Sequence, residues 1–171
     1  PSKDLLPPVA EALTATIAAS TAEIPADAWN RLLAATDPHA NPFLAHAFFL
    51  ALEQSGSATR RTGWTPRHIV LRDGESIVGL MPMYEKIHSQ GEYVFDHGWA
   101  NAFEQAGGSY YPKLQSAVPC TPVTDPTLLA ATPDPRLRRA LLTAAGTLYS
   151  PRCDYPLKAR SAPAETALLE T

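Results

Sequence analysis

Prolines interrupt this chain often and limit where its helices and strands can run. Seventeen of the 171 residues are proline, about twice the usual share. Proline has no backbone N–H and a fixed φ, so it is excluded from helix interiors and from central strands. The prolines fall at the boundaries of apolar segments and in two dense clusters. They therefore divide the chain into short elements.

The apolar segments between the prolines predict four helices. Apolar residues recur there at helical spacing, and Asn41-Pro42 and Asp134-Pro135 supply a cap followed by a proline in the first turn. Gly56 is placed to end the second helix. The predicted helices cover residues 25–36, 43–54, 100–105 and 135–148.

A β-hairpin is the clearest strand signal. Two β-rich runs flank the turn dipeptide Asp73-Gly74, which favours antiparallel pairing. Pro82 indicates a bulge or an edge position. The predicted strands cover residues 68–72, 76–81, 83–87, 92–95 and 114–118. Together with the helices they predict an α/β (α+β) fold, with a mixed, mostly antiparallel sheet and flanking helices.

Charge and composition exclude several classes of protein. The net charge of −3 leaves no basic field for nonspecific binding of DNA or anionic lipid, although a local RNA contact stays open. No stretch is apolar enough to span a membrane, and residues 1–20 make a poor signal peptide. Cys120 and Cys153 are expected to be reduced, partly buried thiols rather than a disulfide. We therefore expect a cytoplasmic protein.

The connection before the last helix is unsuited to a nucleotide or coenzyme A. Phosphates need free backbone N–H groups at a helix N-terminus. Residues 119–135 contain five prolines and no glycine, and Asp125 and Asp134 would repel a phosphate. We expect no cofactor site in this segment.

Metal and nucleophile sites also find little support. His88, Glu92, Asp96 and His97 are close in sequence, but strand alternation points His97 away from the two carboxylates. These residues are more simply a solvated strand edge. The chain has no GxSxG motif, and Cys120 has no basic neighbour in sequence to lower the pKa of its thiol.

Two segments, 93–99 and 110–115, mix aromatic rings with single charges, as binding pockets do. The alternative is that the rings pack in the core while Asp96 and Lys113 pair or face water. Composition alone leaves both interpretations open.

The strings NPFLAHAFFLALEQSGSATRRTGWTPRHIVL and GLMPMYEKIHSQGEYVFDHGWANAFEQAGGSYYPKLQSAVPCTPVT contain these segments. They resemble the FemAB-like proteins of the peptidoglycan biosynthesis/recognition type, which belong to the GNAT-related acyltransferases. The resemblance covers about residues 28–149. It implies that residues 25–149 are the N-terminal GNAT-like half of a protein about twice as long. Residues 1–24 are rich in alanine and threonine with weak periodicity, which indicates a partly disordered leader that holds one frayed helix.

The resemblance also implies a reaction. Relatives transfer an amino acid from aminoacyl-tRNA to an amine on a lipid-linked cell-wall precursor. The donor, acyl-CoA or aminoacyl-tRNA, would be held by a C-terminal GNAT-like half, and no catalytic residue can be carried over. The residues that match the family's motifs and could line a substrate groove are Tyr84, Lys86, Tyr93, Asp96, Trp99, Tyr110, Tyr111, Lys113 and Gln115.

The chain departs from the family at two places. Cys120 stands where an aromatic residue is more usual. Residues 150–163, SPRCDYPLKARSAP, do not look like the strand expected after the last helix, so residues 150–171 are interpreted as a divergent or truncated tail. The sheet would then lose a strand and expose an edge.

Three functional hypotheses follow. The first is the N-terminal half of an acyl- or aminoacyltransferase, not competent alone, with the acceptor amine near Asp96 and Lys113. The second is a noncatalytic module that recognises a peptide or cell-wall fragment. The third is an inactive truncated product.

Overall fold

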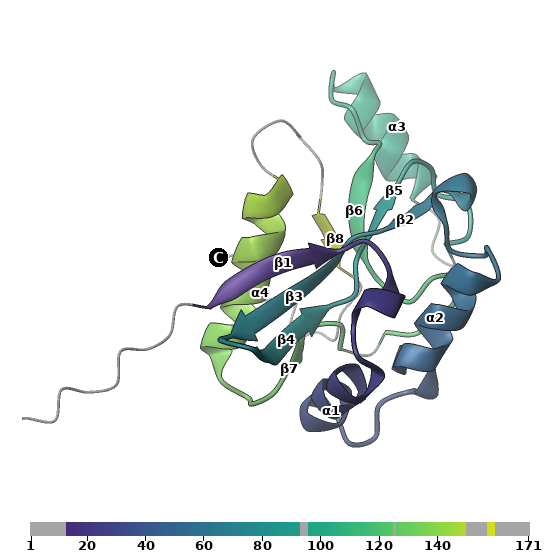
Figure 1. The fold of residues 1–171 in the computed structure, drawn as a ribbon. Coiled ribbons are helices and arrows are strands. Elements are labelled where there is room, and N and C mark those ends of the chain that lie inside the picture. The colour runs from purple at the N-terminus through teal and green to yellow at the C-terminus, as the bar shows by residue number, and fades with distance from the viewer. Residues whose placement is uncertain (1–12, 93–95, 125, 150–156, 160–171) are drawn as a thin grey trace, which may run out of the picture.

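The computed structural model describes residues 13–92, 96–124, 126–149 and 157–159. Figure 1 shows a mixed sheet region with α4 on one face, α1 and α2 on the other, and α3 projecting beyond the end of the strands. The α-helices are α1 (Ala26–Thr36), α2 (His46–Gln54), α3 (His97–Gln105) and α4 (Pro135–Tyr149). The 3-10 helices are η1 (Thr21–Glu23), η2 (Pro42–Leu44) and η3 (Arg60–Thr62). The described residues thus form the predicted α+β fold.

The strands form two four-stranded sheets. They are β1 (Thr14–Ala18), β2 (Trp64–Pro66), β3 (His68–Asp73), β4 (Ser76–Met81), β5 (Tyr84–Lys86), β6 (Lys113–Ser116), β7 (Leu129–Ala130) and β8 (Leu157–Ala159). The first sheet has the order β1-β3-β4-β7 and the second β2-β5-β6-β8. Every pairing is antiparallel except β6 with β8.

One long hairpin links the sheets. The predicted pairing across Asp73-Gly74 is confirmed as β3 with β4. The same two chain segments continue as β2 and β5, and the ladder is interrupted at Pro82, which has no N–H to donate. Arg67 N–H donates to the Met83 carbonyl at 2.8 Å and joins the two halves. Pro82 therefore marks the step between the sheets.

Strand alternation divides the core into two layers. Val70 and Leu80 belong to the cluster that packs against α1 and α2, whereas Ile69 and Leu71 pack against α4 through Leu141. Neighbouring strand residues point to opposite faces, so a run that is apolar at every position predicts burial on both sides.

Several predicted boundaries are wrong. Thr14–Ala18 pair with β3 as a strand, and the described part of residues 1–24 holds a single 3-10 turn, η1, in place of the expected frayed helix. Leu157–Ala159 add β8 in parallel to β6, although residues 150–163 lacked a strand pattern. Leu129–Ala130 form β7 within the proline-rich connection. In each case an edge strand forms by pairing with a well-defined neighbour rather than from its own propensity.

The helices depart less from their predicted bounds than the strands do. The second predicted helix is split, because Ala45 is extended between η2 and α2. Gly56 has a φ of 80° directly after that helix, as predicted. Helix α3 begins three residues earlier than predicted, at His97. The proposed strand over 92–95 lies mostly outside the described residues.

A buried polar network, here called the His68 network, ties the N-terminal segment to the core. It consists of Ser20, Thr21, Glu53 and His68. Met83 N–H donates to His68 Nδ1 at 3.2 Å, so Nε2 carries the proton and donates to Glu53 Oε1 at 3.1 Å. The network joins η1, α2 and β3 through a neutral imidazole of fixed tautomer.

Glu53 is the common acceptor of the network. It receives the Ser20 hydroxyl at 2.8 Å and the Thr21 N–H at 2.9 Å. Burial alone would raise the pKa of Glu53, but the hydrogen bonds from His68, Thr21 and Ser20 outweigh it and lower this pKa below 4.5. The carboxylate is therefore ionised at neutral pH.

Candidate functional site

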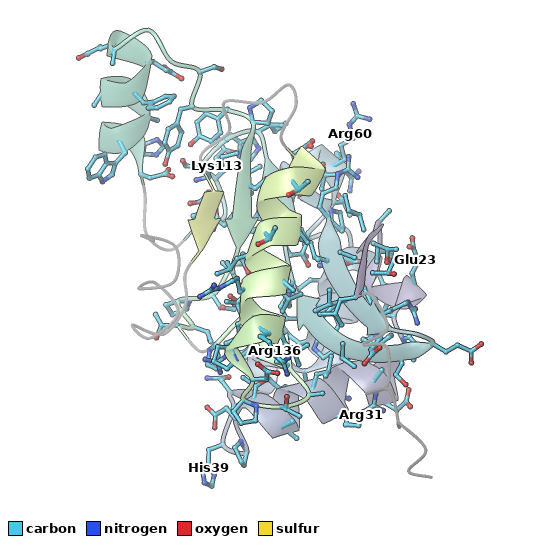
Figure 2. The ribbon with its side chains drawn as sticks, turned by 90° about the vertical axis from the view of Figure 1, so that its left-hand side faces the viewer. Glu23, Arg31, His39, Arg60, Lys113 and Arg136 are labelled. Atoms are coloured by element: carbon cyan, nitrogen blue, oxygen red, sulfur yellow. The ribbon has the colours of Figure 1, made fainter. Side chains whose placement is uncertain are left out.

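A buried ammonium group lies at the end of the molecule from which α3 projects. Lys113, the first residue of β6, has no exposed surface. Its Nζ lies 2.8 Å from Glu92 Oε1 and also contacts Asp96 Oδ2. Figure 2 shows Lys113 at this end, far from Arg136 on α4. Two carboxylates thus enclose one cation away from water.

Hydroxyl groups complete the shell around Asp96. Tyr110 donates to Oδ2 at 2.7 Å, and Ser89 donates to Oδ1. The Tyr111 hydroxyl contacts Ser89 Oγ and lies 3.4 Å from Asp96 Oδ1. These contacts define the Lys113 cluster, which consists of Ser89, Glu92, Asp96, Tyr110, Tyr111 and Lys113.

The two tyrosines stay protonated in this setting. Burial raises the pKa of Tyr110 above its usual 10, and the hydrogen bond to Asp96 raises it further. Burial likewise raises the pKa of Tyr111; the hydrogen bond with Ser89 opposes this rise, and the charge of Asp96 adds to it. Both phenols are therefore hydrogen-bond donors at neutral pH. Tyr111 is only half-buried, so the cluster reaches solvent at this side chain.

A second buried lysine lies directly opposite the first. Lys86 of β5 is the register partner of Lys113. Its Nζ donates to the Gln90 carbonyl at 2.8 Å and lies 3.7 Å from the centre of the Trp64 ring. Burial lowers the pKa of Lys86 to about 8, although the charge of Glu92 opposes this shift. Lys86 therefore loses its proton more easily than an ordinary lysine.

Two positions along these strands, on the same face of the sheet, the register pair is Tyr84 and Gln115. The Tyr84 ring packs edge-on against Trp64, with ring centres 5.4 Å apart. Among the described residues, the Tyr84 hydroxyl and Gln115 Oε1 are buried without a hydrogen-bond partner. Burial raises the pKa of Tyr84 well above 10. The pair thus extends the polar face of β5 and β6 into the core.

The predicted groove residues separate into two groups. Seven of them gather on β5, on β6, in the segment just before β6 and at the N-cap of α3: Tyr84, Lys86, Asp96, Tyr110, Tyr111, Lys113 and Gln115. Trp99 does not join them, because it is 77% exposed on α3. Tyr93 lies outside the described residues. Asp96 and Lys113 form the pair that the core interpretation anticipated, and both are buried.

Three contributors were missed as site residues. Glu92 was considered only as a metal ligand. Strand alternation places it on the same side as Asp96, and this was the signal that could have identified it as a site residue. Ser89 and Trp64 carried no signal, because their roles depend on cross-strand neighbours. Cys120 is a free, exposed thiol with a φ of 58°, which corrects the expected burial. Cys153 lies outside the described residues.

Other kinds of site find no support in the described residues. They contain no group of three or more His, Cys, Asp or Glu side chains arranged to hold a metal ion. Lys113 occupies the space between the two carboxylates instead. None of the helices in the described ranges has the length and hydropathy needed to cross a bilayer. A cavity of about 570 Å³ lies elsewhere, between Ala15 of β1 and Arg139 of α4.

Comparison with known proteins identifies a family. The family model described as FemAB-like, peptidoglycan biosynthesis/recognition, matches residues 20–152. That range holds every member of the Lys113 cluster. Neither a curated protein nor a solved structure matches the chain.

Proposed function

The chain belongs to the FemAB-like family, and on that premise we propose that it forms the acceptor-binding half of an N-acyltransferase or aminoacyltransferase. The acceptor is an amine of a cell-wall precursor. The observation that carries this proposal is the Lys113 cluster, in which Glu92 and Asp96 hold an ammonium group out of water.

The cluster has the chemistry that an amine acceptor needs. A buried cation is costly unless carboxylates and hydrogen bonds compensate it, and this site supplies both. An acceptor ammonium that arrives beside Asp96 would enter the same negative potential. Tyr111, where the cluster reaches solvent, marks the side from which the acceptor enters.

The reaction is amide formation between two positioned substrates. The amine gives up a proton to a base, and its nitrogen lone pair attacks the carbonyl carbon of the donor. The new C–N bond forms while the C–S bond of a thioester, or the C–O bond of an aminoacyl ester, breaks. The rest of the donor leaves as a thiol or an alcohol after taking up a proton, while its acyl group stays on the amine.

The donor site is proposed to lie in a second, C-terminal GNAT-like half of the protein. At the N-terminus of α4 the Asp134 carboxylate already accepts the Arg136 N–H at 2.9 Å and the Arg136 guanidinium at 2.7 Å. Pro133 and Pro135 offer no N–H there. A coenzyme diphosphate or a tRNA 3′ end would therefore find the first turn of α4 already occupied by the Asp134 carboxylate in its ion pair with Arg136.

A second candidate function is recognition without catalysis. Both Asp96 oxygens already accept hydrogen bonds from side chains of the cluster, so this carboxylate is better placed to bind a cation than to remove a proton. A module of this kind would bind an amine-bearing cell-wall peptide and leave it unchanged.

One experiment separates the two functions. The complete encoded protein is incubated with an amine-bearing stem peptide and either acetyl-CoA or an aminoacyl-tRNA, and the peptide is examined by mass spectrometry. The acyltransferase proposal predicts an acetylated or aminoacylated product with one donor and none from an N-acetylated control peptide. Binding of the peptide by calorimetry without product from either donor supports recognition instead. The absence of both binding and product would contradict both functions.

A further inference from the structure

Strand β1 forms an open edge of the first sheet (Figure 1). It pairs with β3 on one side, and no strand in the described ranges pairs with its other side. Every second residue of such a strand directs its N–H and C=O groups outward, where they can bind another strand. The strand also lies before residues 20–152, the range that the family model matches. The proposed acyl transfer therefore does not account for it.

β1 lacks the features that usually keep an edge strand from pairing. Its sequence of five residues, TATIA, has no charge and no proline. The other edge strands in the described part of the chain are shorter: β7 has two residues, β8 has three, and β2 has three and ends in Pro66. Of the edges that the structure describes, β1 is thus the best suited to receive a further strand.

An exposed side chain and a hollow lie two residues apart on one face of β1. Ile17 is 38% exposed, although its register partner on β3, Ile69, is fully buried. Ala15 points to the same face as Ile17 and lines the cavity of about 570 Å³ beside α4. Ala140 and Ala144 of α4 also line this cavity. The cavity, here called the Ala15 hollow, can therefore accept a branched apolar side chain.

Antiparallel pairing of β1 with a second copy of itself would bring each isoleucine to a hollow. A two-fold axis at Thr16, the midpoint of Thr14–Ala18, aligns the whole strand with its copy. Ala15 then stands opposite Ile17 of the second copy on the α4 face, and symmetry forms the reverse pair. The same contact therefore removes both isoleucines from water.

The charges at the two ends of β1 favour the same arrangement. The Glu23 carboxylate accepts the Ala19 N–H at 3.3 Å, beside the C-terminal end of the strand. Arg139 lines the Ala15 hollow together with Leu13, at the N-terminal end. Antiparallel pairing would bring opposite ends together, so that Glu23 of one copy approaches Arg139 of the other. A parallel pair would place like charges together.

We propose that the free edge of β1 binds the same edge of a second copy, which gives a two-fold dimer with one sheet continuous across the axis. The inference is independent of the proposed function, because β1 contributes no residue to the Lys113 cluster. The contact involves one short strand and the exposed Leu13 and Ile17 of each copy. We therefore expect a reversible dimer with a Kd on the order of 10 µM.

A single cysteine tests the dimer and its register together. With every other cysteine changed to serine, Cys120 and Cys153 included, Thr16→Cys places one thiol beside the two-fold axis. Opposed strand residues have Cα atoms about 4.5–5.5 Å apart, within reach of a disulfide. Thr14→Cys is the matched control, because it stands opposite Ala18 of the second copy. We expect mild oxidation of the complete protein to cross-link Thr16→Cys and to leave Thr14→Cys mostly monomeric.

Analytical ultracentrifugation of the complete protein measures the equilibrium itself. The wild type should change from monomer to dimer between about 1 and 100 µM. Ile17→Lys should weaken the dimer at least tenfold, since it puts a charge on the edge in place of the apolar side chain. Phe43→Lys, at an exposed residue of η2, which packs against α2, should leave the equilibrium unchanged. Circular dichroism of the dilute samples verifies that each variant is folded.

A wild-type protein that stays monomeric at about 100 µM overturns the inference. Slow hydrogen exchange of the β1 amides in that monomer would assign the edge to another part of the encoded protein. A dimer that survives Ile17→Lys and forms no Thr16→Cys cross-link also overturns it, because another surface then holds the copies together. Equal cross-linking of Thr14→Cys and Thr16→Cys contradicts the proposed register.

Discussion

The His68 network and the Lys113 cluster are both polar and buried, yet they are built differently. The His68 network is organised around one ionised carboxylate and a neutral imidazole, with each donor and acceptor assigned. The Lys113 cluster encloses a full positive charge between two carboxylates. The first joins three elements of the core, whereas the second lies at one end beside a projecting helix (Figure 1).

The difference shows that some buried polar groups stabilise the fold, whereas others are better explained by binding. A network with one hydrogen-bonded charge and every group satisfied stabilises one arrangement of the chain and needs nothing further. A concentrated group of buried charges contributes little net stability, because desolvation offsets the attraction. Such a group beside exposed aromatic rings is better explained by binding.

The largest expected effect on stability comes from breaking the Lys113 cluster. Lys113→Met leaves Glu92 and Asp96 buried beside each other without their cation. We expect a loss of about 3–5 kcal/mol in the free energy of unfolding, measured by urea denaturation. The matched control is Lys86→Met, which removes the buried register partner that has no carboxylate contact within salt-bridge distance among the described residues. Equal losses in the two variants would show that the carboxylates do not depend on Lys113.

The His68 network should give a smaller loss. Glu53→Gln replaces an acceptor of several hydrogen bonds with an amide that can accept at only one atom. We expect a loss of about 2 kcal/mol at pH 7. Glu23→Gln, on an exposed carboxylate of η1, is the control and should change little.

The acid dependence of Glu53 provides a further check. Its pKa is lower in the folded state than the ordinary 4.5, so the unfolded chain takes up the proton first. The stabilisation is therefore present above pH 4.5 and is lost as the pH falls through the folded pKa. Glu53→Gln should lose less stability than the wild type on acidification. A steeper acid loss in the variant would contradict the lowered pKa.

Lys86 should also make the fold more stable as the pH rises, but in a higher pH range than Glu53. Its folded pKa of about 8 lies below the ordinary 10.5, so the charged form is disfavoured in the fold. The cost is complete below pH 8 and is relieved as the pH rises to 10.5. Relative to Lys86→Met, the wild type should gain on the order of 1–2 kcal/mol across this range. A constant difference between the two proteins would show that the pKa of Lys86 is not lowered.

The smallest effect on stability is expected at Trp99. Trp99→Ala should change the free energy of unfolding by less than about 0.5 kcal/mol, because the side chain is largely exposed. Trp64→Ala, on a buried ring, should cost about 3–5 kcal/mol by the same thermal or urea measurement. A large loss at Trp99 would mean that its ring packs in the core after all.

The sequence predicts the central hairpin and the helices well, because those elements carry their own signals. Asp73-Gly74 fixes a turn between two β-rich runs, and Pro135 stands in the first turn of α4. The edge strands β1, β7 and β8 escape prediction, since each forms by pairing with a neighbour distant in sequence. Local pattern carries no information about such a partner.

The candidate site, like the fold, could be predicted from the sequence only in part. Asp96 and Lys113 were found because charges stand out among aromatic residues in sequence. That they pair, and that Glu92 joins them, follows from β6 lying beside the end of β5. The exposure of Trp99 was not foreseen, because sequence cannot show that α3 projects away from the body of the fold.

The acceptor-amine assignment of the Lys113 cluster is tested most directly by one pair of titrations. Calorimetry would compare the complete protein's affinity for an amine-bearing stem peptide with that for the same peptide N-acetylated at the amine. We predict at least tenfold tighter binding of the free amine, and loss of this preference in Asp96→Asn. Equal affinity of the wild-type protein for both peptides would contradict the assignment.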